Sequence, residues 1–438
     1  MCGIIAAASE RNVGKLLVKG LHKMEYRGYD SAGIALHQKD QIAHLRTLGK
    51  VKLLEEKMIS EKPKSKLGIA HTRWATHGEP SEENAHPHKS NERVYIVHNG
   101  IIENYIELKN FLKKEGYNFS SQTDSELIAH MIEYFLGQGN DMLDSMYLTK
   151  NKLDGAYAIA AIDKNDDTKI TIARSKSPLL IGIGKYGSLA ASDPLAISGL
   201  TNKFIFLEDG DVAEISSKEY KIYDDSKNEV QRDISQIDIS NEATSKGSYR
   251  HFMEKEIYEQ PDAILNTIDG RVGGDDVLDN IFGLGSSEVF AKVKRIQIVA
   301  CGTSLHAGRV AANWLSAISE LPAQIDYASE YRYRNPHVDE DSLLVTISQS
   351  GETADTLAAL RYGKEKGYLS TLTICNVPTS ALARESDYSI FTNAGPEIGV
   401  ASTKAFTTQL AALMLLALSL AKSRNKNPKL RTRVITAM

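Results

Sequence analysis

The stretch MCGIIAAA (residues 1–8) places a cysteine directly before an apolar run that is typical of a buried strand. Initiator methionine is usually removed when the next residue is small, so we expect the mature chain to begin at Cys2. That residue would then carry a thiol together with a free α-amine, which titrates at roughly 7.7–8.0, far below a lysine. An unprotonated amine is a base for the neighbouring thiol, and this is the chemistry of N-terminal nucleophiles.

The composition of the 438-residue chain is that of an ordinary soluble enzyme. Its net charge is −4 without a basic block, which argues against nucleic acid as a main partner. Its three cysteines, Cys2, Cys301 and Cys375, form no CxxC pair, and this pattern favours a reducing, cytoplasmic setting. The apolar start is too short for a signal peptide. Residues 410–421 are almost wholly apolar but fall short of the ~20 needed for a membrane span, so we expect a buried core helix and no membrane partner.

The distribution of predicted strands and helices along the sequence predicts two domains. Residues 2–215 contain short strands with a few helices, which predicts a layered α+β domain. Residues 216–250 are polar and charged, and we predict a linker there. Between residues 251 and 425 strands alternate with helices, which predicts a doubly wound α/β domain with a parallel sheet. Residues 426–438 follow as a short C-terminal segment.

Two helices of the first domain are predicted at residues 12–26 and 125–136. Thr123 and Glu126 have the spacing of a capping box before the second helix. Residues 182–187 match GxGxxG, but a dinucleotide site needs a helix directly afterwards, and the sequence reaches Pro194 too soon. We therefore expect a β-turn at this place and no nucleotide cofactor.

Asn99 and Gly100 follow a predicted strand at residues 94–98. A side-chain amide beside a glycine N–H is a plausible oxyanion hole, because glycine lets the backbone approach a substrate closely. The alternative is an Asn-Gly hairpin turn, which is common in proteins.

A loop at residues 71–78, HTRWATHG, offers a binding site for a carboxylate. The planar fork of Arg73 suits a carboxylate, and three further polar groups stand beside it, at Thr76, His77 and Gly78. The alternative is a surface loop with an arginine ion pair. Asp124, placed in the first turn of its helix, would either hold a substrate ammonium or interact with the helix dipole.

A carboxylate clamp together with an ammonium clamp describes a free amino acid as the substrate. The histidines of His86-Pro87-His88 could point to a metal, but no third ligand appears at a suitable spacing, so we expect no metal.

Three loops of the second domain share one character, since each is rich in hydroxyl groups and precedes a predicted helix: CGTS (301–304), SQSGET (348–353) and VASTKAF (400–406). Hydroxyls and backbone N–H groups at a helix N-terminus favour an anion. Open α/β sheets bind ligands at the carboxyl ends of their strands. The alternative is that Ser and Thr only cap these helices. With no Walker lysine present, the three loops together favour a small sugar phosphate.

The first domain resembles the glutaminase domain of the glutamine–fructose-6-phosphate aminotransferase (glucosamine-6-phosphate synthase) family, in the class II amidotransferases. Five motifs carry the resemblance, in the right order: Cys2-Gly3-Ile4, EYRGYDSAG (25–33), HTRWATHG (71–78), HNGIIEN (98–104) and SQTDSE (121–126). The three hydroxyl-rich loops resemble the sugar isomerase (SIS) domain of the same family. The resemblance implies a four-layer αββα N-terminal-nucleophile domain followed by an αβα SIS domain.

The resemblance also implies roles for single residues. Cys2 would attack the side-chain amide of glutamine, with Asn99 and Gly100 stabilising the oxyanion. Arg73 would hold the α-carboxylate and Asp124 the α-ammonium. Trp74 would gate a sheltered path for ammonia, which protonates in water and then loses its nucleophilicity. Fructose-6-phosphate would be held by seven residues: Thr303, Ser304, Ser348, Gln349, Ser350, Thr353 and Ser402. The family suggests a homodimer that needs no cofactor.

The family continues beyond this chain with a second SIS domain, which carries the acid and base residues of the isomerisation. No residue between 251 and 438 replaces them, so we expect a fragment of a longer protein. Two alternatives remain open, a short protein that only hydrolyses glutamine or senses a sugar phosphate, and a decayed copy. Amidophosphoribosyltransferase and asparagine synthetase types are disfavoured, because the loops after the first domain resemble neither.

Overall fold

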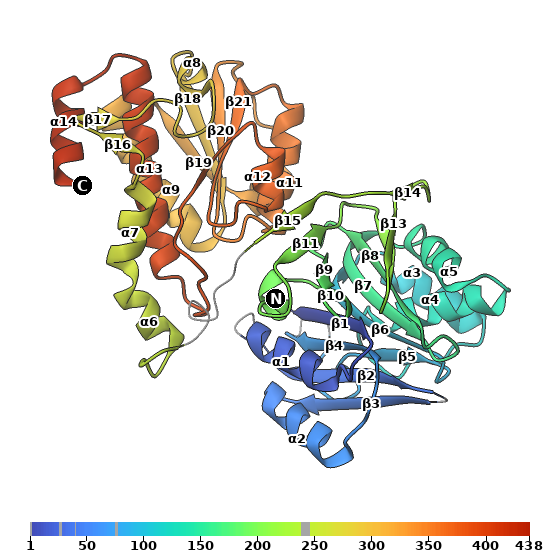
Figure 1. Cartoon of the computed structure of the whole chain (residues 1–438). Coiled ribbons are helices and arrows are strands. Elements are labelled where there is room, and N and C mark those ends of the chain that lie inside the picture. The colour runs from blue at the N-terminus through green and yellow to red at the C-terminus, as the bar shows by residue number, and fades with distance from the viewer. Residues whose placement is uncertain (1, 26–28, 40, 75–77, 238–245) are drawn as a thin grey trace. The chain divides into compact units, whose positions relative to one another are not determined.

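The computed structural model describes most of the chain, and its described residues are 2–25, 29–39, 41–74, 78–237 and 246–438. They form two compact units, Met1–Ser245 and Lys246–Met438. Each unit has its own sheets (Figure 1). Each also has its own hydrophobic core.

The first unit is built on two antiparallel sheets. Within the described residues the larger sheet has eight strands, in the spatial order β15 (Ile234–Gln236), β11 (Lys203–Phe206), β9 (Leu180–Gly184), β10 (Gly187–Ala191), β1 (Gly3–Ser9), β4 (Leu67–Arg73), β2 (Ser31–Gln38) and β3 (Gln41–Leu48). Over the same residues the other has seven, in the order β14 (Glu229–Val230), β13 (Tyr220–Tyr223), β12 (Val212–Ser216), β8 (Lys169–Ser175), β7 (Gly155–Asp163), β6 (Val94–Ile102) and β5 (His88–Ser90). The strand that follows Cys2 therefore lies inside its sheet, between β10 and β4.

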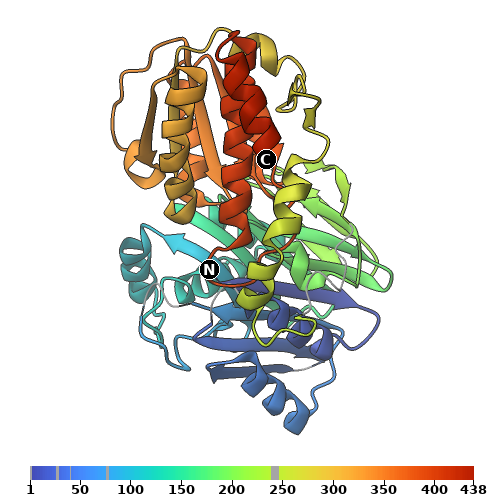
Figure 2. The same cartoon turned by 90° about the vertical axis from the view of Figure 1, so that its left-hand side faces the viewer.

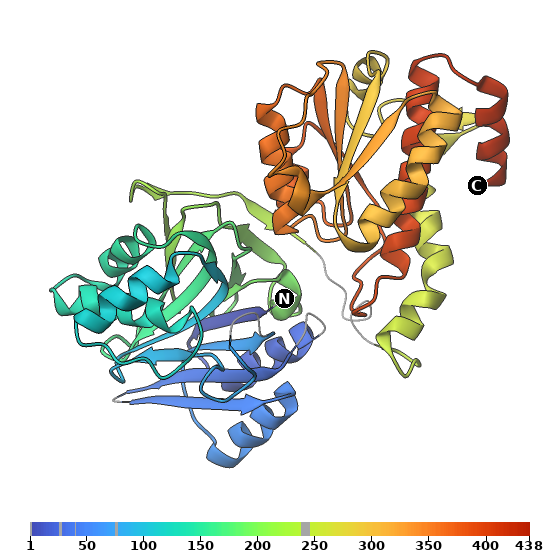
Figure 3. The same cartoon turned by 180° about the vertical axis from the view of Figure 1, so that it is seen from behind.

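Helices cover the outer face of each sheet and complete four layers (Figures 1 and 3). The first sheet is covered by α1 (Gly14–Met24) and α2 (Val51–Glu61), and the second by α3 (Tyr105–Lys114), α4 (Glu126–Gly137) and α5 (Met142–Lys150). A short 3-10 helix, η2 (Pro194–Ile197), packs against α1. Side chains of both sheets meet in a core between them. Because β1 is buried on both faces, its residues from Ile4 to Ala8 are all apolar, with Ile4 in the central core and Ile5 on the helix side. The expected αββα arrangement is confirmed.

The predicted linker at residues 216–250 differs from the structure over its first half. Residues 220–236 contribute β13, β14 and β15 to the two sheets of the first unit. Ile222 is buried in the central core, with Tyr220 packed against it. Two apolar side chains at a spacing of two residues are enough for a strand, but the charged residues around them concealed this pattern. Residues 238–245 of the predicted linker lie outside the described residues.

The GxGxxG stretch at residues 182–187 forms a hairpin between β9 and β10, with Gly184 paired to Gly187. The predicted turn is therefore confirmed. No helix follows it among the residues that the structure describes in this part of the chain, since β10 runs to Ala191 and the four-residue η2 comes next.

The second unit is built on a parallel sheet. In the described part of the chain this sheet has five strands, in the order β19 (Ala323–Tyr327), β18 (Arg295–Ala300), β20 (Ser342–Ser348), β21 (Ser370–Cys375) and β22 (Tyr388–Phe391). One face is covered by α9 (Gly302–Ser319) and α13 (Lys404–Ser423), which lie side by side in Figure 2, and the other by α10 (Ala328–Tyr331), α11 (Ala354–Glu365) and α12 (Ala381–Glu385). The predicted doubly wound fold is confirmed.

Smaller elements complete the second unit: α6 (Phe252–Tyr258), α7 (Gln260–Ile268), α8 (Ser286–Phe290), α14 (Pro428–Ala437) and the hairpin of β16 (Val272–Gly273) with β17 (Asp276–Val277). Among the described residues one helix, α13, is long and apolar enough to cross a membrane by length and composition. Yet 72% of its most apolar window is buried inside the structure, and its leucines and alanines form much of the core. The predicted core helix is confirmed.

Candidate active site

The thiol of Cys2 lies at the end of β4. The backbone N–H of Trp74 donates to Cys2 Sγ at 3.2 Å, and the carbonyl oxygen of Trp74 lies 3.5 Å from the same sulfur. The next residue, Gly3, pairs with Thr72 of β4, and an added Cβ on Gly3 would come within 2.8 Å of Thr72 Oγ1. A larger residue after the cysteine would therefore have to displace the side chains of Thr72 and Met24.

Burial raises the pKa of the Cys2 thiol, although the N–H of Trp74 and the positive chain terminus oppose the rise. The thiolate is thus disfavoured at neutral pH in this place, and a nucleophilic cysteine here needs a base. The α-amine of a mature Cys2 is the base that the sequence predicts.

Asn99 and Gly100 lie inside β6, where they pair with Ala158 and Tyr157 of β7. Both the hairpin alternative and the expectation that the strand ends at residue 98 are therefore wrong, because β6 continues to Ile102. Asn99 Nδ2 donates to the carbonyl oxygen of Cys2 at 3.3 Å, so the structure brings the predicted amide donor beside the thiol residue. Gly100 has φ 137°, and an added Cβ would lie 1.8 Å from the carbonyl oxygen of Ala156, so only glycine fits there.

His71 is a neighbour of this site that the sequence analysis did not single out. Its Nε2 lies 2.9 Å from Asn99 Oδ1. The ring is fully buried and packs against the ring of His86, with a centroid separation of 4.1 Å. Burial lowers the pKa of His71 to about 3, so the imidazole is neutral at physiological pH. Its place as the first residue of the predicted loop at residues 71–78 was the signal that the sequence offered for it.

Arg73 ends β4 with a buried guanidinium group. Its Nη2 donates to the carbonyl oxygen of Gly78 at 3.2 Å, its Nη1 donates to that of Glu79 at 3.3 Å, and Asp30 lies 3.7 Å away. Gly78 has a positive φ of 75°, and its predicted contact with the substrate stays a prediction. Thr76 and His77, the other two predicted loop residues, lie outside the described residues.

Two amide side chains tie this loop to the segment that carries Asp124. Asn84 Nδ2 donates to the carbonyl oxygen of Glu79 at 2.9 Å and to Gln122 Oε1 at 3.2 Å. The N–H of Gln122 donates back to Asn84 Oδ1 at 2.8 Å. The sequence analysis missed both amides, because they meet only through the fold.

Asp124 is buried and lies close to β6. Its Oδ2 accepts the backbone N–H of Ile102 at 2.8 Å. It precedes the N-cap residue Ser125 and does not stand in the first turn of α4, as the sequence analysis expected. The predicted capping box is also wrong, because Glu126 instead accepts the N–H groups of Ser120 and Ser121. Both differences place the acid in the loop before the helix, on the side of β6.

In the second unit, side-chain hydroxyl groups of the loop after β20 form hydrogen bonds within that loop. The Oγ of Ser348 lies 2.9 Å from Thr353 Oγ1 and accepts the N–H of Gly351 at 3.1 Å. Ser350 Oγ accepts the N–H of Glu352 at 3.2 Å. Thr353 is the N-cap residue of α11 but makes no side-chain cap bond, so the simple capping alternative does not hold for this loop.

The loop after β18 leads into α9. Cys301 is the N-cap residue and makes no side-chain cap bond, and Thr303 and Ser304 fall in the first turn. Thr303 is exposed and Ser304 is buried. Since β18 lies between β19 and β20, the chain leaves β18 and β20 in opposite directions across the sheet. Such a switch point is where open α/β sheets form a ligand crevice.

The third predicted loop differs from the other two. At the N-terminus of α13, the carboxylate of Glu397 accepts the N–H of Thr403 at 2.8 Å and that of Ala405 at 3.0 Å. The expectation that this helix start offers its N–H groups to a ligand is therefore wrong, because an acidic side chain of the chain itself occupies them. Ser402 lies next to this cap and is half-buried.

Asn376 joins the loops at this edge of the sheet. Its backbone N–H donates to the carbonyl oxygen of Gln349 at 3.1 Å. Its side chain donates to the carbonyl oxygen of Gly395 at 2.7 Å and accepts the N–H of Ala394 at 2.8 Å. The loop after β20 and the segment before α13 are thereby held together at the carboxyl ends of the strands.

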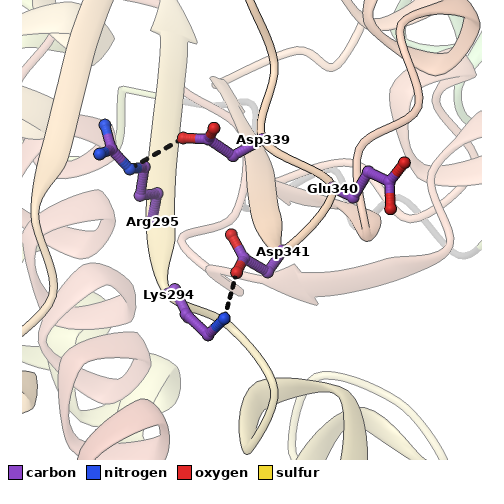
Figure 4. A pocket seen from close by; sticks show the side chains of 5 residues that line it. All are labelled: Lys294, Arg295, Asp339, Glu340 and Asp341. Atoms are coloured by element: carbon purple, nitrogen blue, oxygen red, sulfur yellow. Dashed lines mark ion pairs between the residues drawn. The ribbon is translucent and has the colours of Figure 1, made fainter.

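A shallow, open depression lies at the opposite edge of the same sheet (Figure 4). It is lined by charged side chains at the starts of β18 and β20: Lys294, Arg295, Asp339, Glu340 and Asp341. Lys294 pairs with Asp341 at 2.7 Å and Arg295 with Asp339 at 2.9 Å, so most of its charges are already matched. It lies at the amino ends of the strands, away from the predicted phosphate loops.

Two family models match the chain. A glutamine amidotransferase domain matches residues 71–198, and a SIS domain matches residues 289–419. Each match lies within one of the two structural units.

Curated relatives match almost the whole chain. The glutamine–fructose-6-phosphate aminotransferase (isomerizing) of Vibrio vulnificus is 50% identical over 98% of this chain and 70% of that protein. The protein of the same name from Pseudomonas putida is 52% identical over 97% of this chain and 70% of that protein. Among solved structures, the C-terminal domain of glucosamine-fructose-6-phosphate aminotransferase from Francisella tularensis is 49% identical, with a TM-score of 0.43, over 44% of this chain and 54% of that one.

Proposed function

This chain belongs to the glutamine–fructose-6-phosphate aminotransferase family, and we propose that it hydrolyses glutamine at Cys2 and passes the released ammonia to fructose-6-phosphate. The products are glutamate and glucosamine-6-phosphate, so the chain serves amino-sugar synthesis. One observation supports this proposal above the others. The thiol of Cys2, just before β1, lies against the end of β4, which carries Arg73, and the side-chain amide of Asn99 reaches Cys2 from β6 of the facing sheet.

In the glutaminase step, the α-amine of mature Cys2 takes the proton of the thiol. The thiolate then attacks the side-chain amide carbon of glutamine, forming a C–S bond and an oxyanion. The Nδ2 group of Asn99 and the N–H of Gly100 are assigned to this oxyanion. Collapse breaks the C–N bond, and ammonia leaves with the proton that the amine held. Water hydrolyses the thioester and releases glutamate.

The clamp for the rest of the substrate is assigned to Arg73 and Asp124. A buried guanidinium whose neighbours include backbone carbonyls is positioned for a carboxylate, because charge-assisted bonds gain strength away from water. We assign the α-carboxylate of glutamine to Arg73, with Thr76, His77 and Gly78 in its loop, and the α-ammonium to Asp124. Trp74, with 53% of its surface exposed, is assigned to the shelter of the departing ammonia.

The acceptor site is assigned to the switch point of the parallel sheet. The N-cap residues of α9 and α11, Cys301 and Thr353, make no side-chain cap bond, and a helix N-terminus favours the charge of a phosphate. Fructose-6-phosphate is assigned to the residues of these loops and of the α13 loop: Thr303, Ser304, Ser348, Gln349, Ser350, Thr353 and Ser402. Condensation of ammonia with its C2 carbonyl releases one water, which balances the water used for the thioester. No residue of this chain is assigned to the isomerisation that follows.

The test incubates the purified 438-residue protein with glutamine, with and without fructose-6-phosphate, and measures glutamate and glucosamine-6-phosphate separately. Glutamate that disappears in Cys2→Ala supports the assignment of the nucleophile. Glucosamine-6-phosphate in proportion to glutamate supports the whole reaction, while glutamate alone restricts the chain to the first half. If neither glutamate nor glucosamine-6-phosphate forms, the proposal is overturned in favour of a sugar-phosphate-binding module. Light scattering on the same sample tests the proposed homodimer, and cell fractionation tests the proposed cytoplasmic location.

A further inference from the structure

Two hydrogen bonds link Cys2, Asn99 and His71, and the bond between Asn99 and Cys2 determines the direction of both. The carbonyl oxygen of Cys2 only accepts, so the group that Asn99 turns toward it must be the NH2 group, at 3.3 Å. Asn99 Oδ1 then faces Nε2 of His71 at 2.9 Å. An oxygen in that position needs a donor, so His71 carries its proton on Nε2.

We propose that His71 is a positioning residue that holds the carboxamide of Asn99 with its NH2 group toward Cys2, where the oxyanion forms. The inference rests on the proposed function and adds to it a residue that touches no substrate.

The carboxamide of Asn99 depends on such support. Its plane turns freely about χ2, and a half turn would point an oxygen at the oxyanion. Its two partners among the residues that the structure describes are the carbonyl oxygen of Cys2 and Nε2 of His71. The carbonyl belongs to the nucleophile itself, so His71 is the partner that stays fixed.

His71 is held firmly enough for this purpose. It lies in β4, between Ile4 of β1 and Gly33 of β2 in the strand register. No part of its side chain is exposed, and the ring of His86 packs against it. The neutral imidazole has one proton, and the bond to Asn99 fixes it on Nε2.

The test uses two amide replacements that differ in reach. In His71→Gln the amide nitrogen takes the place of Nε2 and still donates to Asn99, whereas in His71→Asn it takes the place of Nδ1 and falls short. We expect His71→Gln to keep kcat for glutamine hydrolysis within about fivefold. His71→Asn is expected to lose about 10²-fold in kcat, as the loss of an oxyanion donor does, with KM little changed. His37→Asn serves as a control, because His37 is also buried and its Nε2 lies 2.8 Å from the carbonyl oxygen of Lys164, at the far end of β2.

Two further readouts separate positioning from general damage. An aldehyde analogue of glutamine forms a hemithioacetal with Cys2, whose oxygen takes the place of the oxyanion. Its inhibition constant should rise in His71→Asn in parallel with the loss of kcat, while that of the product glutamate stays constant. Adding Asn99→Ala to His71→Asn should cause no further loss, because both remove the same interaction.

Equal kcat in His71→Gln and His71→Asn overturns the inference, as do multiplicative losses in the double variant. Should His71→Asn fail to fold, nitrogen-15 NMR of the histidines in the wild-type protein decides, because the inference requires the Nε2–H tautomer at His71. That measurement needs no activity. Absence of glutamine hydrolysis in the wild type contradicts the proposed function and is therefore distinguishable from failure of the inference.

Discussion

The backbone N–H of Trp74 donates to Cys2 Sγ at 3.2 Å, so the end of β4 fixes the sulfur while the α-amine of the same cysteine is left to act as its base. Inserting one alanine between Met1 and Cys2 would turn that amine into an amide. We expect glutamine hydrolysis to fall by at least about 10²-fold, the usual contribution of a general base. Initial rates of glutamate release measure this effect.

The control for the insertion is the reactivity of the thiol itself. Because burial raises the pKa of Cys2, its alkylation by iodoacetamide should accelerate as the pH rises from 7 to 9 in both proteins. Mass spectrometry of the N-terminus verifies which residue begins each chain. Unchanged hydrolysis in the inserted variant would contradict the role of the amine.

Gly100→Ala is expected to destabilise the first unit severely. The new Cβ would lie 1.8 Å from the carbonyl oxygen of Ala156, so β6 and β7 would have to separate. Gly116→Ala is the matched control, because Gly116 also has a positive φ, 93°, but an added Cβ would meet nothing within 4 Å. We expect a cost of about 1 kcal/mol for the control and more than about 3 kcal/mol for Gly100→Ala in denaturant unfolding. Equal losses of unfolding free energy in the two variants would show that the contact with Ala156 does not determine the cost of a side chain at Gly100.

Lys404→Met is expected to weaken the binding of fructose-6-phosphate by about tenfold. Lys404 is buried at the start of α13, and its Nζ lies 2.7 Å from Glu259 Oε2. Loss of this pair should loosen the segment that carries Ser402. Lys426→Met removes an exposed pair with Glu320 and should leave binding unchanged. Calorimetric titration gives both dissociation constants. Equal values for the two variants would show that the α13 loop does not contribute to the binding of fructose-6-phosphate.

The stability of the first unit should fall as the pH falls from 7 to 5. Burial lowers the pKa of both His71 and His88 to about 3, so these rings stay neutral in the folded state while the unfolded chain binds protons below about 6.5. The unfolded state then holds more protons than the folded state. The free energy of unfolding therefore falls by about 2 kcal/mol for each of the two rings between pH 7 and pH 5. Thermal unfolding at the two pH values measures the effect.

A substitution in the same cluster provides the comparison. His86 packs against both rings, its pKa is also lowered by burial, and neither of its nitrogens has a hydrogen-bond partner among the described residues. His86→Phe keeps an aromatic ring but cannot bind a proton, so its loss of stability on acidification should be smaller than that of the wild type. An equal or steeper loss would show that other groups govern the acid response.

The sequence predicted what local patterns encode. Apolar runs located most of the strands, and the alternation of strands with helices after residue 251 predicted the parallel sheet. Cys2, Asn99 and Arg73 were candidates because of their side-chain chemistry and because the motifs around them resemble a known family, and their roles stay predictions. Such signals are contained in a few neighbouring residues, so a single sequence carries them.

What the sequence did not predict depends on contacts between distant segments. The bond from His71 to Asn99 spans 28 positions, and the cap that Glu397 forms on α13 depends on how the loop between them turns. Glu126 has the spacing of a capping box, yet the N–H groups of Ser120 and Ser121 offered it better partners. Hydrogen-bond partners of buried polar groups are chosen by the fold, which a linear pattern does not reveal.

The place of α13 in the chain has a consequence for synthesis on the ribosome. This helix covers one face of the parallel sheet, yet it follows the first strand, β18, by about a hundred residues. At the usual rates of translation, α13 would emerge on the order of ten seconds after β18. During that interval α9 already covers part of this face, but the part that α13 covers stays exposed to the surroundings. The surface that waits for α13 is therefore one that a chaperone could protect in the nascent second unit.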